Sequence, residues 1–111
     1  MAKGDFLGEF EQLVLLALLR LGEDAYGMAV RREIADRAGR DVAIGAVYAT
    51  LDRLEQKGLV RSWTAAATDD RAGRPRRCFR ITGEGGRALD RSQRALRQML
   101  EGLPARWNPA R

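Results

Sequence analysis

The stretch Ile44-Gly45-Ala46-Val47-Tyr48-Ala49-Thr50-Leu51-Asp52-Arg53-Leu54-Glu55-Gln56-Lys57-Gly58-Leu59-Val60 decides the fold that we expect for this chain. Its large apolar residues, Ile44, Val47, Leu51 and Leu54, follow one another at intervals of three, four and three. This spacing places all four on one side of a helix with 3.6 residues per turn. The pattern therefore predicts an amphipathic helix whose apolar side is buried.

The opposite side of this helix is nearly bare in its first half. It carries Gly45, Ala46 and Ala49, and only further along do Arg53 and Gln56 add hydrogen-bonding groups. Small side chains allow a helix to approach another macromolecule closely. An ordinary amphipathic helix with a plain surface fits this segment equally well when it is taken alone.

Length and charge limit the class of protein. A chain of 111 residues forms one domain with a small core, so we expect self-association to add buried surface. Its 20 basic and 15 acidic residues favour an anionic partner, such as nucleic acid or a membrane surface. The start of the chain shows no signal-peptide pattern, and the longest apolar run, 13–19, is too short to span a bilayer. We therefore expect a cytoplasmic protein.

The residue inventory argues against an enzyme. Cys78 is the only cysteine and histidine is absent, which excludes a zinc site and a Cys-His nucleophile pair. Ser62 and Ser92 lie in no nucleophile motif, and the glycines of 83–86 lack the lysine of a phosphate loop. We expect no catalytic residues, no metal and no cofactor.

Two further helices precede the central one. The first is predicted over 8–21, apolar over more than one face. The second is predicted over 25–38, with Asp24 as its N-cap and Gly39 as its stop. Its buried stripe should comprise Tyr26, Val30, Ile34 and Ala38. Three helices joined by short turns are the outline of a helix-turn-helix domain.

The periodicity changes from 3.6 to 2 after Gly58. Alternation predicts a strand over 60–66, a polar loop over 68–75, and a second strand over 76–81. Phe79 and Ile81 should share one face of the second strand, and Cys78 and Arg80 the other. The result is a β-hairpin with a basic tip.

The last helix should begin after a Thr82 cap, with the part from Arg87 onward the stronger helix former because Gly83, Gly85 and Gly86 weaken its first turn. It carries a heptad-like seam that favours contact with a second helix along its length. The residues assigned to dimerisation are Leu89, Ser92, Leu96, Met99, Leu100 and Leu103. Gly102 and Pro104 should end the helix.

Together these elements predict an α+β, mainly α, winged helix-turn-helix: three helices plus a β-hairpin wing, with a C-terminal dimerisation helix. The DNA-binding domain should span 1–81, the dimerisation helix 82–104 and an irregular tail 105–111.

An ordered series of motifs resembles the PadR family of bacterial transcriptional regulators, in its small subfamily with a single C-terminal dimerisation helix. The motifs are Ala25-Tyr26-Gly27, Gly45-Ala46-Val47-Tyr48, Leu51-Asp52-Arg53-Leu54-Glu55, Lys57-Gly58-Leu59-Val60, Trp63, Gly73-Arg74-Pro75-Arg76-Arg77, Phe79 and Ile81-Thr82 with Gly85. The resemblance implies a homodimeric repressor whose third helix enters the major groove of an operator, with the wing on the backbone or minor groove.

Position by position, Tyr48 resembles the family tyrosine near the DNA backbone, and Arg74, Arg76 and Arg77 resemble its basic wing. The chain departs from the family pattern at Ala49, where proline is frequent, and at Phe79, where tyrosine is frequent. Ala43 lies where a small hydroxyl would cap the third helix, so Asp41 or backbone geometry must replace it.

Residue chemistry supports double-stranded DNA as the partner. Arg53 and Gln56 are types that read base edges, whereas Tyr48 and Thr50, expected beside the exposed face, suit phosphates. For Arg53 the alternative is a surface pair with Glu55 or Asp52. The predicted DNA-binding set is Gly45, Ala46, Tyr48, Ala49, Thr50, Arg53, Gln56, Arg71, Arg74, Arg76 and Arg77.

Trp63 and Trp107 are candidates for an effector pocket, because some members of the resembling family bind flat hydrophobic compounds between subunits. A small hydrophobic or aromatic effector is therefore a possible partner. Two other functions stay open from the sequence: a winged-helix protein-interaction module, and a nonspecific nucleic-acid-binding protein.

Overall fold

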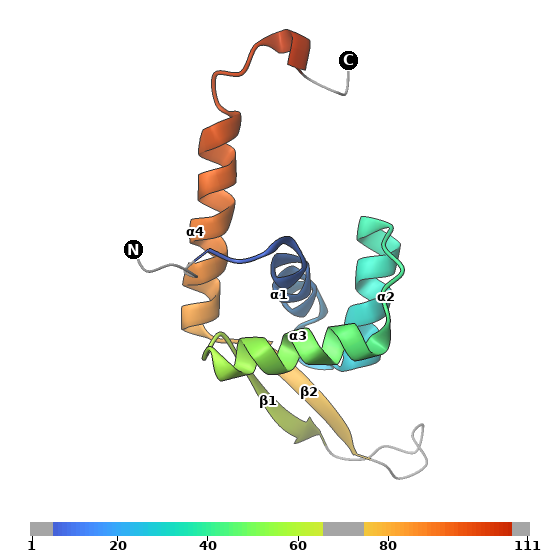
Figure 1. Cartoon of the computed structure of the whole chain (residues 1–111). Helices are drawn as coiled ribbons and strands as arrows, with labels where there is room; N and C mark the ends of the chain where they lie inside the picture. Colours follow the sequence, from blue (N-terminus) through green and yellow to red (C-terminus); the bar gives the residue numbers. More distant parts are fainter. Residues whose placement is uncertain (1–5, 66–74, 108–111) are drawn as a thin grey trace.

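The computed structural model describes residues 6–65 and 75–107 (Figure 1). Its elements are α1 (Glu9–Leu21), η1 (Gly22–Asp24), α2 (Gly27–Ala38), α3 (Ile44–Gln56), β1 (Val60–Ala65), β2 (Arg76–Ile81), α4 (Gly83–Leu100) and η3 (Ala105–Trp107). Three helices precede a two-stranded antiparallel hairpin, and a long helix follows it. The predicted mainly α winged helix-turn-helix is confirmed.

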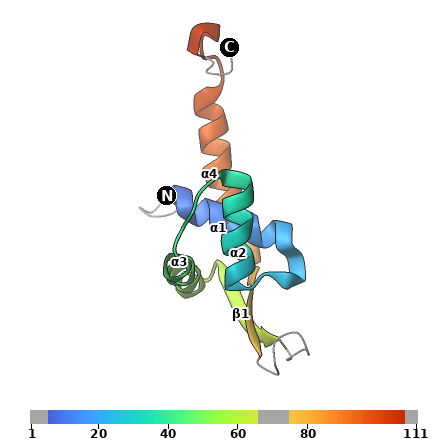
Figure 2. The ribbon, with the colours of Figure 1, turned by 90° about the vertical axis from the view of Figure 1, so that its right-hand side faces the viewer.

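The core lies where α1, α2 and α3 meet, and α3 is fixed there by its apolar side. Val47, Leu51 and Leu54 are fully buried, while Ile44 at the first turn is only half-buried. They pack with Val14 and Leu15 of α1, the central helix. Figure 2 shows α1 passing behind α2, with α3 seen nearly end-on beside the lower part of α2. The opposite side of α3 is left exposed.

The second helix begins later than predicted. Ala25 and Tyr26 are extended, because the Ala25 carbonyl accepts a hydrogen bond from Phe79 N–H and Tyr26 pairs with Cys78 of β2. Asp24 therefore lies in the η1 turn and does not cap α2. Tyr26 is half-buried and Ala38 is exposed, so the predicted buried stripe is right only at Val30 and Ile34.

The link between α2 and α3 is held by Arg31 of α2. Its Nε donates to the Val42 carbonyl at 2.6 Å, and its Nη2 lies 3.2 Å from the Asp41 carboxylate. No side chain caps α3; Ala43 turns the chain with an extended backbone. Of the two expected solutions, backbone geometry is the one observed.

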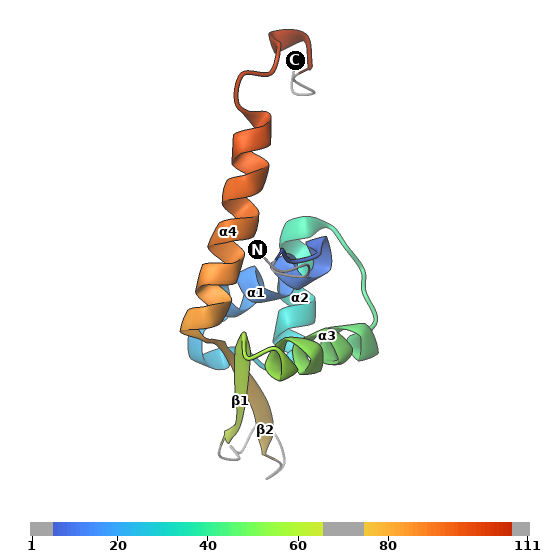
Figure 3. The same ribbon diagram turned by 60° about the vertical axis from the view of Figure 1, so that its left-hand side comes forward.

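The wing pairs β1 with β2 from Val60↔Ile81 at its base to Ala65↔Arg76. Figure 3 shows the hairpin projecting below α3, away from α4. Both Cys78 and Phe79 are buried, although they point to opposite faces of β2. Cys78 is therefore covered as well, which the strand pattern did not predict, although Arg61 and Arg80 on the same face are exposed. Residue 66 and the predicted loop 68–74 lie outside the described residues.

Helix α4 begins at Gly83, before the predicted stronger start at Arg87. The Thr82 hydroxyl accepts from the Gly85 N–H at 3.0 Å, which confirms the predicted cap. Gly85 is buried, and a Cβ built on it would lie 2.1 Å from the Leu59 carbonyl oxygen. Glycine therefore lets the first turn of α4 lie directly on the chain that enters the wing. The tail is not wholly irregular, because 105–107 form a 3₁₀ turn.

We expect Gly85→Ala to lower the free energy of unfolding by about 1–3 kcal/mol, since the added methyl group meets rigid backbone. Gly86→Ala is the matched control in the same helical turn, with nothing within 4 Å of the added carbon. It should raise stability by about 0.5–1 kcal/mol, because alanine favours the helix. Urea denaturation of both variants measures this, and equal effects of the two changes would contradict the packing argument.

Candidate nucleic-acid interface

The exposed side of α3 carries the small residues that the sequence placed there. Gly45, Ala46 and Ala49 are exposed, and nothing lies within 4 Å of a Cβ built on Gly45. Arg53 and Gln56 are exposed further along the same helix. A macromolecule can thus approach the first half of α3 closely and meet hydrogen-bonding groups at the second half.

Thr50 does not belong to this surface. It is 3% exposed, which contradicts its predicted place beside the exposed face. Its position, three residues after Val47 and four before Leu54, places it on the buried side of the helix. Its hydroxyl lies 3.4 Å from Arg53 Nη2. Thr50 therefore supports Arg53 from within and is not available to a phosphate.

Tyr48 is half-buried and joins three elements. A Cβ on Gly27 of α2 would lie 2.4 Å from Tyr48 Cζ, so the absence of a side chain there makes room for the ring. The ring centroid is 6.3 Å from that of Phe79 in β2. The Tyr48 ring thus packs α3 against α2 and the wing. This packing role is separate from the DNA contact predicted for Tyr48.

Arg53 is held by Glu11 of α1, and not by Glu55 or Asp52 as the alternative suggested. Its Nε lies 3.6 Å from Glu11 Oε2, and the side chain stays 52% exposed. Glu11 Oε2 also accepts from Lys57 Nζ at 2.9 Å, and its Oε1 accepts from Gly8 N–H at 2.9 Å. One carboxylate thus anchors two cations at the C-terminal end of α3.

Glu11 itself is 7% exposed. Burial raises the pKa of its carboxyl, but the hydrogen bonds from Lys57 and Gly8 and the charges of Lys57 and Arg53 together hold that pKa below its ordinary value of 4.5. Glu11 and Gln12 are polar residues of an otherwise apolar helix, and both are buried. Glu11 forms the return half of a capping box by accepting from Gly8 N–H, but Gly8 has no side chain to supply the other half, so the sequence signature is incomplete.

Arg77 braces the wing instead of standing free. Its guanidinium lies 3.0 Å from Asp52 Oδ1 and 2.8 Å from Glu55 Oε1, both on α3. Glu55 Oε2 also accepts from the Ser62 backbone N–H and hydroxyl. These bonds fix the wing relative to α3, and they leave Arg77 neutralised, which does not favour the predicted phosphate contact.

The remaining wing arginines divide by location. Arg76 is half-buried, with its guanidinium carbon 3.9 Å from the centre of the Tyr26 ring. Arg71 and Arg74 lie outside the described residues, so their predicted contacts stay predictions.

The predicted dimerisation seam falls into two parts. Leu89 and Ser92 are buried within their own chain, and the Ser92 hydroxyl accepts from Leu7 N–H at 2.9 Å. These two residues are therefore not available to a partner, which corrects the prediction. The C-terminal half is open: Leu96, Met99, Leu100 and Leu103 are 55%, 77%, 52% and 42% exposed.

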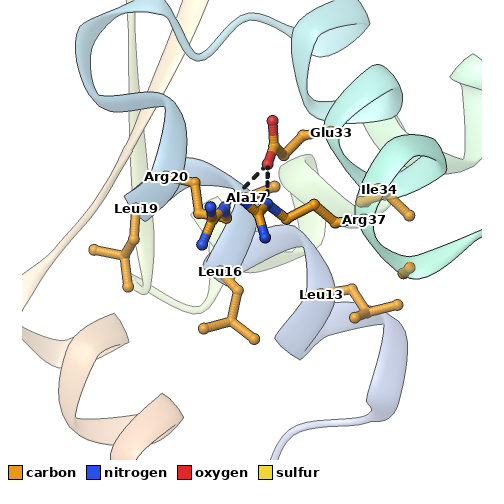
Figure 4. Close-up of a pocket in the computed structure, with 9 residues that line it drawn as sticks. Leu13, Leu16, Ala17, Leu19, Arg20, Glu33, Ile34 and Arg37 are labelled. Atoms are coloured by element: carbon orange, nitrogen blue, oxygen red, sulfur yellow. Dashed lines mark hydrogen bonds and ion pairs between the residues drawn. The ribbon is translucent and has the colours of Figure 1, made fainter.

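A groove of about 700 Å³ lies between α1 and α2. Figure 4 shows Glu33 between Arg20 and Arg37 at its polar side, with leucines of α1 on the other. The groove is lined by Leu13, Leu16, Ala17, Leu19, Arg20, Glu33, Ile34, Arg37 and Ala38.

Neither predicted effector-pocket tryptophan lines this groove. Trp63 is in β1, and Trp107 is in η3, which Figure 1 places at the far end of α4 from the wing. The chain does not bring the two rings together, so a pocket that they share within one chain is ruled out. Among the helices described, none is long and apolar enough to cross a membrane.

Comparisons with known proteins agree with this geometry. The sequence model of the transcriptional regulator PadR-like family matches residues 15–91. No curated protein matches the chain.

Several solved structures are similar. A PadR family transcriptional regulator from Eggerthella lenta is 31% identical, with 85% of this chain and 81% of that one covered and a TM-score of 0.66. A PadR-like transcription factor from Bacteroides fragilis is 25% identical, with 83% and 84% covered and a TM-score of 0.70. A PadR family regulator from Clostridium difficile, 23% identical over 85% and 93%, shares the fold with a TM-score of 0.70. The family and these neighbours are transcription factors and not enzymes.

We expect Glu11→Gln to lower the free energy of unfolding at pH 7 by about 1–3 kcal/mol, because Lys57 and Arg53 lose their charged partner. A lowered pKa means that the carboxylate stabilises the fold above its unfolded value, and that this contribution disappears as the pH falls through the folded value. The difference between variant and wild type should therefore shrink below about pH 4.5.

Denaturation at several pH values measures this difference. Glu9→Gln is the matched control, since Glu9 is exposed on the same helix and pairs with Arg40 on the surface. It should cost about 0–1 kcal/mol. A difference for Glu11→Gln that stays constant between pH 7 and pH 3 would contradict the assigned role of the charge.

Proposed function

We propose a mode of action for this chain, which belongs to the PadR-like family of transcriptional regulators. It is a homodimeric repressor that binds a palindromic operator, with α3 in the major groove and the wing beside it. The observation that carries this proposal is the surface of α3: small residues, then Arg53 and Gln56, on a helix whose other side is fixed in the core.

Sequence reading would come from the second half of α3. Arg53 can pair with guanine O6 and N7, and Gln56 with adenine, each such pair contributing about 1–3 kcal/mol of discrimination. Glu11 holds Arg53 only at Nε, at 3.6 Å, and Thr50 accepts a long 3.4 Å bond from Nη2, so the half-exposed guanidinium keeps further N–H groups that can donate to a base. Gly45, Ala46 and Ala49 let the helix enter deeply. With few base-reading side chains, the shape of the DNA supplies further specificity.

The dimer would form through the exposed apolar residues at the C-terminal half of α4. This half extends beyond the body of the domain (Figure 1). Two copies joined along it would present two α3 helices about one helical turn of DNA apart, roughly 34 Å, which suits a palindromic site. We also propose that the DNA-binding domain ends at residue 81 and the dimerisation helix begins at residue 82. The chain would then belong to the small subfamily, which has a single dimerisation helix.

Repression would act in the cytoplasm by steric exclusion of RNA polymerase. A ligand or partner that changed the angle between the two α4 helices would spoil the spacing of the two α3 helices and release the operator. Any hydrophobic effector would then bind between subunits.

We expect Arg53→Ala to relax sequence preference, reducing the ratio of operator to random-DNA affinity by about 5- to 100-fold. The matched arginine change Arg74→Ala, at the wing tip by sequence, should weaken both DNAs alike. Footprinting upstream of the chain's own gene identifies the operator, and fluorescence anisotropy measures both affinities. Equal losses on operator and random DNA for both variants would refute base reading by Arg53.

Met99→Glu should convert the dimer to a monomer, since it places a charge at the most exposed apolar position of α4. The control Gln98→Glu adds a carboxylate at the neighbouring exposed position and should leave the dimer intact. Sedimentation equilibrium of both variants at micromolar concentration measures the change. A Met99→Glu protein that remains dimeric would place the interface elsewhere.

A further inference from the structure

The wing sheet has an outer face that the contacts of α3 do not use. Register places Arg61 opposite Arg80 and Trp63 opposite Cys78, so these four side chains share one face, and Arg76 lies on it too. Tyr26 pairs with Cys78 from the other side and extends this face by one more residue. Arg77, Phe79 and Ser62 belong to the inner face, toward α3.

Two arginine side chains stack on aromatic rings of the outer face. The Arg76 guanidinium carbon is 3.9 Å from the centre of the Tyr26 ring, and that of Arg80 is 5.3 Å from the Trp63 ring. Arg32 of α2 donates from Nη2 to the Tyr26 hydroxyl at 2.6 Å. Stacking limits the motion of these side chains and leaves the N–H groups at their edges free to donate.

The arginines of this face differ from the others in their partners. Between residues 6 and 81, the described arginines that form an ion pair are Arg20, Arg31, Arg37, Arg40, Arg53 and Arg77. Those with no ion pair to any described carboxylate are Arg32, Arg61, Arg76 and Arg80, and all four lie on the outer face or against its Tyr26 edge.

Such a cluster is unfavourable in the isolated chain. Arg61 and Arg80 are directly opposed across the two strands, where like charges destabilise a sheet. An anion placed over the face would relieve this repulsion. The face offers no apolar centre to a protein partner, because Cys78 is buried and Arg80 lies over Trp63.

We propose that the outer face of the wing sheet is a second DNA-binding surface, which takes backbone phosphates beyond those reached by α3 and the wing tip. Forked guanidinium groups held on rings suit phosphate oxygens, which they can bind in pairs. The contact would carry no sequence information and would lengthen the footprint of each half-site. This inference rests on the proposed function, since it assigns a further part of the same DNA-binding role.

The test compares Arg61→Gln/Arg80→Gln with wild type on the footprinted operator and on a mixed-sequence duplex of 40 base pairs. Losing two phosphate contacts should reduce the slope of log K against log salt by about 1.8, since each contributes about 0.9. Affinity at moderate salt should fall about tenfold on both DNAs alike. Arg87→Gln/Arg94→Gln removes the same charge from paired arginines of α4 and should change affinity less than twofold.

The single change Arg61→Gln is the control for a folding defect, because the exposed Arg61 side chain forms no ion pair with a described carboxylate. It should lower the slope by about 0.9. Unchanged slope and affinity in the outer-face variants, with wild type still bound to operator, would overturn this inference and leave the proposed function standing. Binding of a polyglutamate peptide that these variants lose while DNA affinity stays unchanged would also overturn it, in favour of an acidic protein. Wild type that binds neither duplex at low salt would overturn the proposed function itself.

Discussion

The buried carboxylate of Glu11 is the interaction on which the placement of α3 depends. A charge this deeply buried is tolerated only when it is paired and hydrogen-bonded, and Lys57, Arg53 and Gly8 N–H together meet that demand. Two of these partners lie at the C-terminal end of α3, so α1 fixes the end of the helix that carries the hydrogen-bonding side chains. The buried residues Val47, Leu51 and Leu54 hold α3 in the core, and Glu11 fixes the position of its C-terminal end.

Arginine has two opposite tasks in this chain, and its neighbours decide which. Arg31 and Arg77 bond to carboxylates and carbonyls of adjacent elements, and they thereby fix the α2–α3 link and the wing. Arg76 and Arg80 rest on aromatic rings with no described carboxylate beside them. In the described part of the chain up to residue 81, the arginines without a described ion-pair partner thus gather on one face of the wing sheet or at its Tyr26 edge.

Helix α4 links the body of the domain to its exposed end. Its first half packs on the core through Ala88 and Leu89, and Ser92 and Gln93 reach the segment at Leu7 and residue Gln12. The same segment continues into Gly8, whose N–H binds Glu11. The connection from α4 to the end of α3 therefore runs from Ser92 to Leu7, through the next residue Gly8 to Glu11, and from Glu11 to Lys57 and Arg53. A change in how two α4 helices meet has a physical route to the DNA-facing helix.

The sequence by itself determined the elements and the family, because helix and strand periodicity and turn residues are local: the α3 seam, the hairpin and the Thr82 cap all follow from neighbouring residues. Only the tertiary structure decided which partner each polar group meets. It buried Thr50 and Glu11, tied Arg77 to α3, divided the seam of α4 at Ser92 and separated Trp63 from Trp107. Such pairings join residues far apart in the chain, and periodicity shows which side of an element is buried without showing what covers it.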